Sequence, residues 1–368
     1  MSAQRKYAHT IEGAFKELVL DGKHLGPLEA YKHFERLAER PKAAEWGRDL
    51  FMLINELMMF GGASMQATTS GTTGPPKRMR IARPDLVHSA RLTADTFGLQ
   101  QNDRVLLCLP CAYIAGKMMV VRAMVLGLDL HVIDPRGSVL DNLGECRDRF
   151  RFTAMVPLQL HRAIQEDRAR VEEQFHAILL GGGPVSAALE EDLQEMRTEV
   201  FQGYGSTETV THVAVRKLNG ADRSALYHAI GHVTFTKDLR GCLVVNTPHL
   251  KQKLHTTNDL VELQDATHFR WLGRIDNVIL SGGKKIYPEE LEKRTAGIIP
   301  YAHFFKAFDE PALGQAVMLV LETEDGPDVI HDILDKLFSV LSIHEMPRRV
   351  TALRKFTRTA SGKLVRQG

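Results

Sequence analysis

The sequence predicts an α/β protein with a large N-terminal α/β domain, a small β subdomain and a small α+β C-terminal domain. Between 84 and 205, strand-like and helix-like segments alternate, which is typical of a largely parallel sheet covered by helices. From 228 to 273 the pattern changes to short strands and turns. A shorter unit of strands and a helix follows, so we expect domains at 1–275 and 276–368.

The individual elements follow from hydrophobic spacing and from glycine and proline positions. The first sixty residues are expected to be helical, because Pro27 can begin a helix that places Tyr31, Phe34 and Leu37 near one face. The elements expected in the large domain are strands at 104–109, 129–133, 152–156, 176–180 and 199–202, and helices at 113–127 and 185–198. In the C-terminal unit we expect strands near 304–309 and 315–322 and a helix near 327–341.

Composition excludes several classes of protein. The chain has 368 residues, of which 44% are hydrophobic and 25% charged. Its net charge of +2 lacks the large positive excess that is typical of nucleic-acid-binding proteins. No apolar run reaches transmembrane length, and the N-terminus lacks a signal-peptide core. The 16 histidines show no zinc-site spacing. We therefore expect a cytoplasmic protein without a transition metal.

The cysteines indicate a reducing compartment with free thiols, since the chain has only four. Cys108 and Cys111 form a C-x-x-C pair, which could be a redox dithiol. No thioredoxin-like pattern surrounds the pair, so we favour two small side chains packed at the end of a buried strand.

A segment rich in glycine and hydroxyl side chains, 68–77, predicts a phosphate-binding loop. Glycines let successive N–H groups point at an anion, and hydroxyls and a lysine add donors and charge. The residues expected to hold phosphate are Thr69, Ser70, Gly71, Thr72, Thr73, Gly74 and Lys77. It is not a Walker A loop, because Pro76 takes the place of the second glycine and Arg78 follows the lysine.

Two further glycine segments follow predicted strands, where ligands of such folds bind. In the first, glycines allow a flat base to lie against the backbone; it comprises Gly181, Gly182, Gly183 and Pro184. The second comprises Gly203, Tyr204, Gly205, Ser206, Thr207 and Glu208. There Tyr204 offers a flat face for a purine, Thr207 can donate to phosphate, and Glu208 is a hard oxygen ligand for Mg²⁺. Each segment alone could be an ordinary turn.

The order of these segments resembles the adenylate-forming superfamily, which includes acyl-CoA synthetases, luciferases and peptide-synthetase adenylation domains. Three later segments, 256–260, 271–292 and 358–366, extend the resemblance over nearly the whole chain. It implies that Asp259 binds the ribose, that Arg274 contacts the nucleotide and that Asp276 is a hinge. Asn258 replaces the family's usual glycine beside Asp259. The resemblance also implies that Gly282 and Gly283 allow the backbone to pass beside the pantetheine of CoA.

The chemistry implied by the resemblance has two steps and uses ATP, Mg²⁺ and CoA. A carboxylic acid first forms an acyl-adenylate and pyrophosphate, and a thiol then displaces AMP. Lys77, Thr207 and Lys363 would be the catalytic residues and Glu208 the metal ligand, acting by positioning and charge stabilisation. The small domain is expected to be mobile and to rotate about Asp276 between the steps.

The short region before the phosphate loop resembles the compact o-succinylbenzoate–CoA ligases of menaquinone biosynthesis, as does the segment 109–123. Such an acid carries a second carboxylate, so a cation in the acid pocket is expected. The residues expected around the acid are Tyr113, Lys117, Arg122, Thr211 and His212. Another aryl-acid or acyl–CoA ligase, and a non-catalytic acyl-nucleotide-binding protein, stay open as alternatives, as does a homo-oligomer.

Overall fold

The structure is a computed structural model that describes residues 13–69, 77–325, 327–358, 364 and 366. Its residues form two compact units. The first unit comprises Met1–Pro184, Leu193–Val233 and Asn246–His255, and the second comprises Val185–Asp192, Thr234–Val245 and Thr256–Gly368. The second unit therefore groups much of the predicted β subdomain with the C-terminal residues. The predicted domain boundary between 275 and 276 stays a prediction.

The first unit is built on a mostly parallel sheet, which confirms the predicted fold class. The strand order is β11-β10-β9-β8-β7-β5-β6-β1-β2, and the strands from β9 to β1 in this order run parallel. The strands are β1 (Leu18–Leu20), β2 (Lys23–Leu25), β5 (Arg104–Leu107), β6 (Asp129–Val132), β7 (Phe150–Met155), β8 (Phe175–Leu180), β9 (Glu199–Gly205), β10 (His212–Lys217) and β11 (Tyr227–Ala229).

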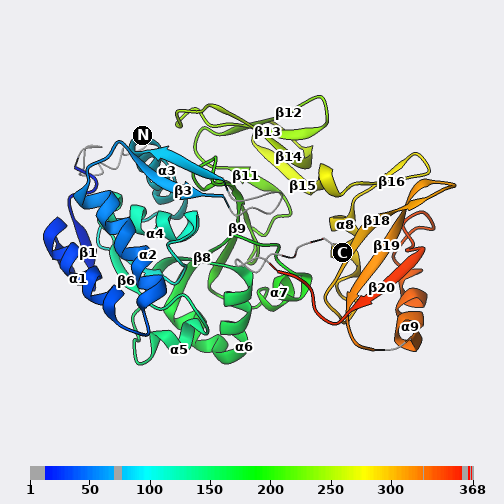
Figure 1. The fold of residues 1–368 in the computed structure, drawn as a ribbon, viewed down its shortest axis with the longest axis horizontal. Helices are drawn as coiled ribbons and strands as arrows, with labels where there is room; N and C mark the ends of the chain where they lie inside the picture. The colour runs from blue at the N-terminus through cyan, green and yellow to red at the C-terminus, as the bar shows by residue number, and fades with distance from the viewer. Residues whose placement is uncertain (1–12, 70–76, 326, 359–363, 365, 367–368) are drawn as a thin grey trace. The chain divides into compact units, whose positions relative to one another are not determined.

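Helices surround this sheet, and a separate hairpin accompanies it (Figure 1). The helices are α1 (Pro27–Glu39), α2 (Ala44–Ile54), the π-helix η1 (Asn55–Met59), α3 (Arg83–Phe97), α4 (Ile114–Leu126), α5 (Val139–Leu143) and α6 (Pro157–Gln174). The hairpin consists of the antiparallel strands β3 (Ser64–Thr68) and β4 (Arg78–Ala82). The predicted helix start at Pro27 is confirmed, and Phe34 is fully buried there.

Helix α4 lies inside the core of the first unit. It contacts α3 and the strands β1, β5, β6 and β7, and its residues from Met118 to Leu126 are all buried. A helix that is apolar on every side is typical of such an interior position. Among the buried residues Met118 to Leu126 of this helix, the one charged residue is Arg122, whose side chain is 1% exposed. A cation at that position is costly unless something compensates its charge.

Two predicted elements of this region were wrong. The first sixty residues are not all helical, because β1 and β2 form a hairpin whose turn residues Asp21 and Gly22 have φ of 49° and 74°. A two-residue turn with positive φ at both positions suits a tight antiparallel hairpin. The predicted helix 185–198 is only α7 (Ala187–Asp192). The carbonyls of Leu193 and Met196 instead accept hydrogen bonds from Asn219 Nδ2, at 3.3 and 3.0 Å.

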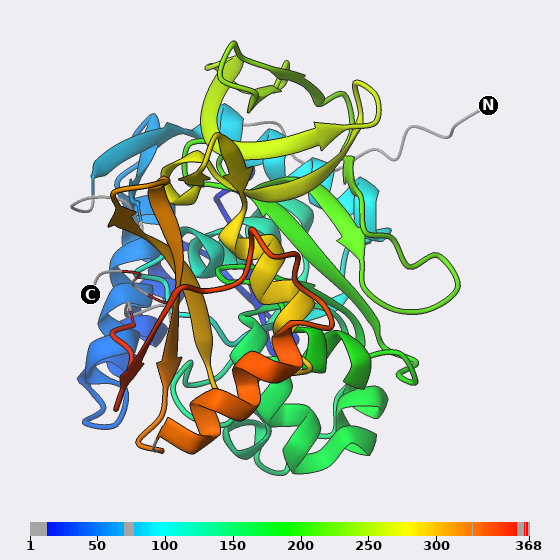
Figure 2. The same cartoon turned by 90° about the vertical axis from the view of Figure 1, so that its right-hand side faces the viewer.

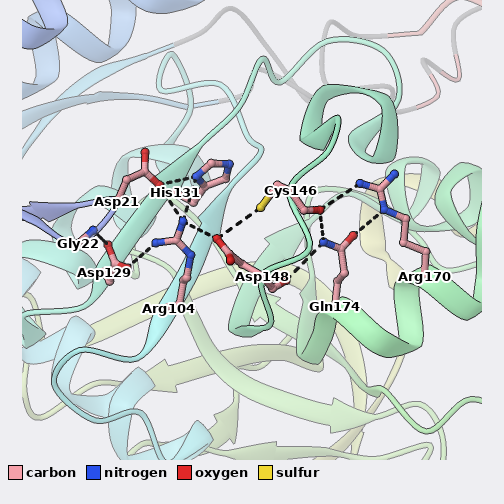
Figure 3. A network of polar contacts seen from close by, with 9 residues as sticks. All are labelled: Asp21, Gly22, Arg104, Asp129, His131, Cys146, Asp148, Arg170 and Gln174. Atoms are coloured by element: carbon pink, nitrogen blue, oxygen red, sulfur yellow. Dashed lines mark hydrogen bonds and ion pairs between the residues drawn. The ribbon is translucent and has the colours of Figure 1, made fainter.

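A polar network ties this hairpin to the amino ends of the parallel strands (Figure 3). Arg104 donates to Asp21 at 2.9 Å and to Asp129, and forms an ion pair with Asp148 at 2.7 Å. His131 contacts the same oxygen of Asp21 at 2.5 Å, and Gly22 N donates to Asp129 at 2.8 Å. Burial alone would raise the pKa of Asp21, but His131 and Arg104 together lower it below its usual value. The network thus fastens β1 and β2 at the end of the sheet opposite the glycine segments.

The second unit contains two groups of strands. The first group follows the order β12 (Thr234–Lys237), β13 (Cys242–Asn246), β14 (Leu254–Leu263) and β15 (His268–Arg274), and a 3₁₀ turn η2 (Ile275–Asn277) follows it. The second group is a sheet with the order β17 (Lys284–Ile286), β16 (Ile279–Ser281), β19 (Gly314–Glu322) and β18 (His303–Glu310), with β20 (Arg349–Leu353) also paired to β19. Helix α8 (Pro288–Thr295) follows β17, and helix α9 (Pro327–Leu337) follows β19.

Side chains of a strand point alternately to the two faces of a sheet, and both faces of the second sheet carry buried apolar residues. Phe305 and the alternate β19 residues Val317 and Leu319 pack with Leu291 of α8 and Ile333 of α9, so both helices lie on one face (Figure 2). On the opposite face, a smaller cluster holds Phe304, Met318, Val320 and Phe356. This arrangement is the small α+β unit expected near the C-terminus. Among the described residues, no helix is both long and apolar enough for a membrane span.

Candidate functional site

The predicted phosphate loop connects β3 to β4. At its base, Thr69 N donates to Lys77 O and Lys77 N donates to Thr69 Oγ1, each at 3.0 Å. The Lys77 side chain is exposed. The other predicted phosphate-binding residues, Ser70, Gly71, Thr72, Thr73 and Gly74, lie outside the described residues. The described part therefore shows a closed hairpin base that carries the predicted lysine.

The two other glycine segments lie at neighbouring carboxyl ends of the parallel sheet. Gly181, Gly182, Gly183 and Pro184 directly follow β8, and Gly181 N donates to Met155 O at the end of β7 at 3.0 Å. The neighbouring strand β9 extends through Gly203, Tyr204 and Gly205, so these residues belong to the strand rather than to a loop after it. The edge of the sheet where ligands bind in such folds thus carries both segments.

Gly205 has a packing reason as well as a predicted ligand role. A Cβ at this position would lie 2.1 Å from the carbonyl oxygen of Thr211 on the antiparallel neighbour β10. Tyr204 is half-buried, and its ring centroid lies 5.7 Å from that of Tyr227. Pairing of β9 with β10 therefore requires glycine at 205 whatever binds there.

The segment after β9 is a turn fixed by its own hydroxyl groups. Ser206 N donates to Thr209 Oγ1 at 2.9 Å, and that hydroxyl donates to Thr211 O at 2.8 Å. Val210 has φ of 69°, a conformation that β-branched residues rarely adopt. Strained backbone of this kind often accompanies functional sites. The turn buries Thr207, which is 8% exposed, and leaves the side chain of Glu208 exposed.

The chemistry of Glu208 fits the predicted magnesium ion. Mg²⁺ in phosphate-transfer sites keeps several waters and uses one or two carboxylates together with substrate phosphates. An exposed carboxylate beside a buried threonine hydroxyl offers such a donor set. Within the described part of the chain no group of three or more His, Cys, Asp or Glu residues could hold a metal alone. The residues present therefore suit a magnesium ion that arrives with a nucleotide.

Arg122 and Thr211, which were both predicted to lie around the acid, are in contact. Arg122 Nη2 donates to Thr211 Oγ1 at 3.3 Å, and its Nε donates to Thr93 Oγ1 of α3 at 3.1 Å. Among the described residues, its Nη1 contacts only the sulfur of Met119, at 3.5 Å, and its Cζ lies 6.0 Å from the ring centroid of Phe152. No carboxylate among the described residues pairs with it. Burial lowers the pKa of Arg122 to about 9.

His212, the next residue, is 6% exposed, and its Nδ1 lies 3.3 Å from Thr211 Oγ1. Burial, and then the charge of Arg122, lowers the pKa of His212 well below its usual value. The imidazole is therefore neutral near pH 7. Its Nε2 is buried and has no hydrogen-bond partner among the described residues. Arg122 and His212, both buried, and the half-buried Thr211 thus form a polar cluster whose one positive charge has no carboxylate partner among the described residues.

The other two predicted acid-site residues are placed differently. Lys117, in the first turn of α4, donates from Nζ to Gln66 O of β3 at 2.9 Å. Gln66 N donates in turn to Glu56 at 2.7 Å, so the two side chains satisfy both backbone groups of one β3 residue. Tyr113 precedes α4 and is half-buried. Lys117 therefore has a structural partner, whereas the guanidinium of Arg122 has no acidic partner in the part of the chain that the structure describes.

In the second unit, three predicted nucleotide and hinge residues form one network. Arg274 donates to Asp276 at 2.6 Å, and one of its nitrogens lies 3.9 Å from the carboxylate of Asp259. Asp259 also accepts from Trp271 Nε1 at 3.1 Å. Asn258 Nδ2 contacts both oxygens of Asp276 at 3.3 and 3.4 Å. The residue that replaces the family's glycine therefore contacts the predicted hinge.

Gly282 and Gly283 form the turn between β16 and β17, with φ of 54° and 78°. These two positive angles match a tight hairpin turn, so the glycines have a local structural reason. The predicted catalytic Lys363 lies outside the described residues. Beyond it, Arg366 pairs with Glu292 at 2.6 Å.

The two cysteines of the C-x-x-C pair are buried and unpaired with each other. Cys108 and Cys111 are free thiols, exposed by 1% and 3%. Burial raises the pKa of each thiol to about 12, so neither ionises near neutral pH. The interpretation that these cysteines pack at the end of a buried strand is confirmed.

Comparison with known proteins agrees with this arrangement. Residues 66–244 match the family described as AMP-binding enzyme. An acyl-CoA synthetase (AMP-forming)/AMP-acid ligase II-like protein from Dyadobacter fermentans is 32% identical, with a TM-score of 0.60, and the match covers 93% of this chain and 97% of that one. The 2-succinylbenzoate–CoA ligase of Bacillus subtilis is 27% identical over 353 residues, 85% of this chain and 70% of the relative. The structure of o-succinylbenzoate CoA synthetase from B. subtilis, in complex with its acyl-adenylate, has a TM-score of 0.70 and is 24% identical in sequence. The match covers 82% of this chain and 67% of that one. At this identity it supports the fold alone.

Proposed function

Because the chain belongs to the AMP-binding enzyme family of adenylate-forming ligases, we propose that it is an AMP-forming acid–CoA ligase whose acid is o-succinylbenzoate. Curated relatives similar to it over most of its length bear the name of that ligase. The observation that carries the choice of acid is the buried guanidinium of Arg122, which has no carboxylate partner among the described residues. A dicarboxylic acid would supply that partner.

The proposed reaction has two balanced steps. In the first, a carboxylate oxygen of the acid bonds to the α-phosphorus of ATP, and the bond to the β-phosphate oxygen breaks to release pyrophosphate. In the second, the sulfur of CoA bonds to the acyl carbon, the bond to AMP oxygen breaks, and the thiol proton passes to solvent. Bound Mg²⁺ would neutralise phosphate charge. The protein's task is to position the reactants and to stabilise developing charge.

Each predicted residue has a role in this proposal. Lys77 and the hydroxyl of Thr207 would bind phosphate, and Glu208 would hold the magnesium ion. The glycine segments after β8 and at the end of β9 would take the adenine, beside Tyr204. Asp259 would accept the ribose hydroxyls and Arg274 would contact the nucleotide. Lys363 would reach the reacting carboxylate and the α-phosphate.

The acid pocket is proposed around α4 and the start of β10. Arg122 would bind the distal carboxylate of o-succinylbenzoate through charge-assisted hydrogen bonds. Thr211 and the neutral His212 would support it, and Tyr113 would line the same pocket. Lys117 is the weaker candidate for the cation, because its ammonium already bonds to Gln66 O. The cytoplasmic location and any homo-oligomer remain predictions.

The test is an assay of AMP release with a panel of carboxylic acids in the presence of ATP, Mg²⁺ and CoA. We expect o-succinylbenzoate to give AMP and the CoA ester in equal amounts, and benzoylpropionate, which lacks the aromatic carboxylate, to react much less well. A preference for benzoylpropionate, the monocarboxylate analogue, would remove the choice of acid and leave another aryl-acid or acyl–CoA ligase. Binding of an acyl-adenylate without turnover of any acid would favour the non-catalytic alternative.

A further inference from the structure

Thr93 is a fully buried residue of α3 whose hydroxyl has two fixed partners. It donates to Ser89 O one turn earlier, at 3.0 Å, and accepts from Arg122 Nε at 3.1 Å. A threonine hydroxyl has one proton, and Ser89 O takes it. The lone pairs of Thr93 are therefore directed at the arginine, which suits a cation that can only donate. The contact links helices α3 and α4 inside the core.

This contact limits how Arg122 can bind an anion. A guanidinium offers five N–H groups, and a carboxylate binds best to a pair of them on one edge. Thr93 takes the hydrogen of Nε, so the edge that includes Nε is no longer free. Within the described part of the chain, Nη1 has only the weak sulfur contact at 3.5 Å, and Nη2 has one bond, to Thr211. The two terminal nitrogens are thus left with unused donors.

The surroundings make this restraint effective. Apart from its hydroxyl partners, Arg122 contacts Met119 and lies over the ring of Phe152, and its side chain is 1% exposed. Thr93 is fully buried, so solvent does not reach Nε from the side of α3. Losing the Thr93 hydroxyl would leave a charged donor buried and unpaired, which is more costly than losing a neutral hydrogen bond.

We propose that Thr93 is a positioning residue for substrate specificity, which holds Arg122 so that its terminal nitrogens bind the distal carboxylate of the acid. This inference rests on the proposed function. It adds a residue of α3 to an acid pocket otherwise assigned to α4 and β10. Thr93 itself does not touch the substrate in this proposal, because its hydroxyl is already used by Ser89 and Arg122.

The test compares Thr93→Val, which removes the hydroxyl at nearly constant volume, with Thr93→Ser, which keeps it. For each variant one would measure kcat/KM for o-succinylbenzoate and for benzoylpropionate, and take their ratio. We expect Thr93→Val to lower the ratio by roughly 10-fold or more, as for loss of a hydrogen bond to a charged group. The value for benzoylpropionate should change by no more than about 3-fold, and Thr93→Ser should restore the ratio.

The Arg122→Met background provides the matched control. If Thr93 acts through Arg122, the double variant Arg122→Met/Thr93→Val should have the same ratio of kcat/KM values for the two acids as Arg122→Met alone. A further readout is the pH above which kcat/KM for o-succinylbenzoate falls, which should move lower in Thr93→Val because the charged guanidinium loses an acceptor. If Thr93→Val fails to fold, Thr93→Ala carries the same expectation for the ratio and the pH profile.

The outcomes separate this inference from the proposed function. Equal losses with both acids, or no rescue by Thr93→Ser, would show that Thr93 only supports the packing of α3 on α4 and would overturn the inference. A wild-type protein that prefers o-succinylbenzoate, with Arg122→Met losing that preference and Thr93→Val keeping it, would overturn the inference alone. A wild-type protein that makes no CoA ester, or prefers benzoylpropionate, would overturn the proposed function and this inference with it.

Discussion

Replacing Arg122 by methionine should weaken acid specificity while it stabilises the ligand-free fold. Methionine keeps most of the apolar volume and removes a charge that no described carboxylate compensates. In the complex, the distal carboxylate would lose its buried cation, a loss of roughly 2–5 kcal/mol. That range corresponds to a decrease of about 30-fold to several thousand-fold in kcat/KM for o-succinylbenzoate. Benzoylpropionate should lose far less.

The effect on stability follows from the pKa of Arg122. Burial lowers it from 12.5 to about 9, a difference of about 3.5 units, or on the order of 5 kcal/mol of disfavoured charge. Because the folded pKa of this cation is depressed, the penalty is complete below pH 9 and is relieved as pH rises from 9 towards 12.5. Near pH 7, Arg122→Met should therefore raise the unfolding midpoint of the ligand-free protein, even though two threonine contacts are lost.

The assay combines thermal unfolding without ligand with steady-state kinetics for both acids. In the wild type, kcat/KM for o-succinylbenzoate should also fall above pH 9, because the free enzyme then loses the guanidinium charge. The reasoning would be refuted if Arg122→Met lowered the unfolding midpoint by several degrees and reduced kcat/KM equally for both acids. Arg122 would then be a structural residue that the fold needs in its charged form.

Other predictions concern the two half-reactions and the second candidate cation. Lys363→Ala should abolish adenylate formation but still pass a supplied acyl-adenylate to CoA; an equal loss in both half-reactions would contradict this role. Asp276→Pro should block rotation at the predicted hinge, because proline fixes φ, so pyrophosphate exchange should survive while CoA-ester formation collapses. Equal activity in both would remove Asp276 from the hinge. Lys117→Met should leave the ratio of kcat/KM for the two acids within about 3-fold of wild type, since Lys117 bonds to Gln66 O; a much larger loss of that ratio would make Lys117 the acid-binding cation.

Much of the fold was predictable because its signals are local. Alternating apolar segments indicated the parallel strands from β5 to β9, and glycine segments marked the carboxyl ends of β8 and β9. The hairpin of β1 and β2 was missed although Asp21-Gly22 is a strong turn signal between short apolar runs. Helix α7 was predicted too long, because the hydrogen bonds from Asn219 that end it come from a residue distant in the sequence.

The candidate site was predictable in its residue types and less so in its contacts. Arg122 and Lys117 are five positions apart on one helix, and sequence alone gave no way to choose between them. Their tertiary partners separate them: the edge of β3 for Lys117 and the buried hydroxyls of α3 and β10 for Arg122. Thr93 gave no signal, because a threonine inside a helix is usually only a packing residue. Such assignments require the fold, since each depends on one long-range contact.

The hairpin of β1 and β2 gives the parallel sheet a short outer strand with exposed charged residues. β1 covers the edge of β6, and the short outer strand β2 presents Lys23 and His24 to solvent. An exposed lysine on a three-residue strand is a poor template for another chain. A protein that lacks residues 1–25 would instead expose the backbone of β6 on the side that β1 covers, beside buried apolar residues such as Leu130. We expect this shortened protein to aggregate during expression or storage. A shorter form of the chain for structural work should therefore keep the hairpin, together with Arg104, which bonds to Asp21 in its turn.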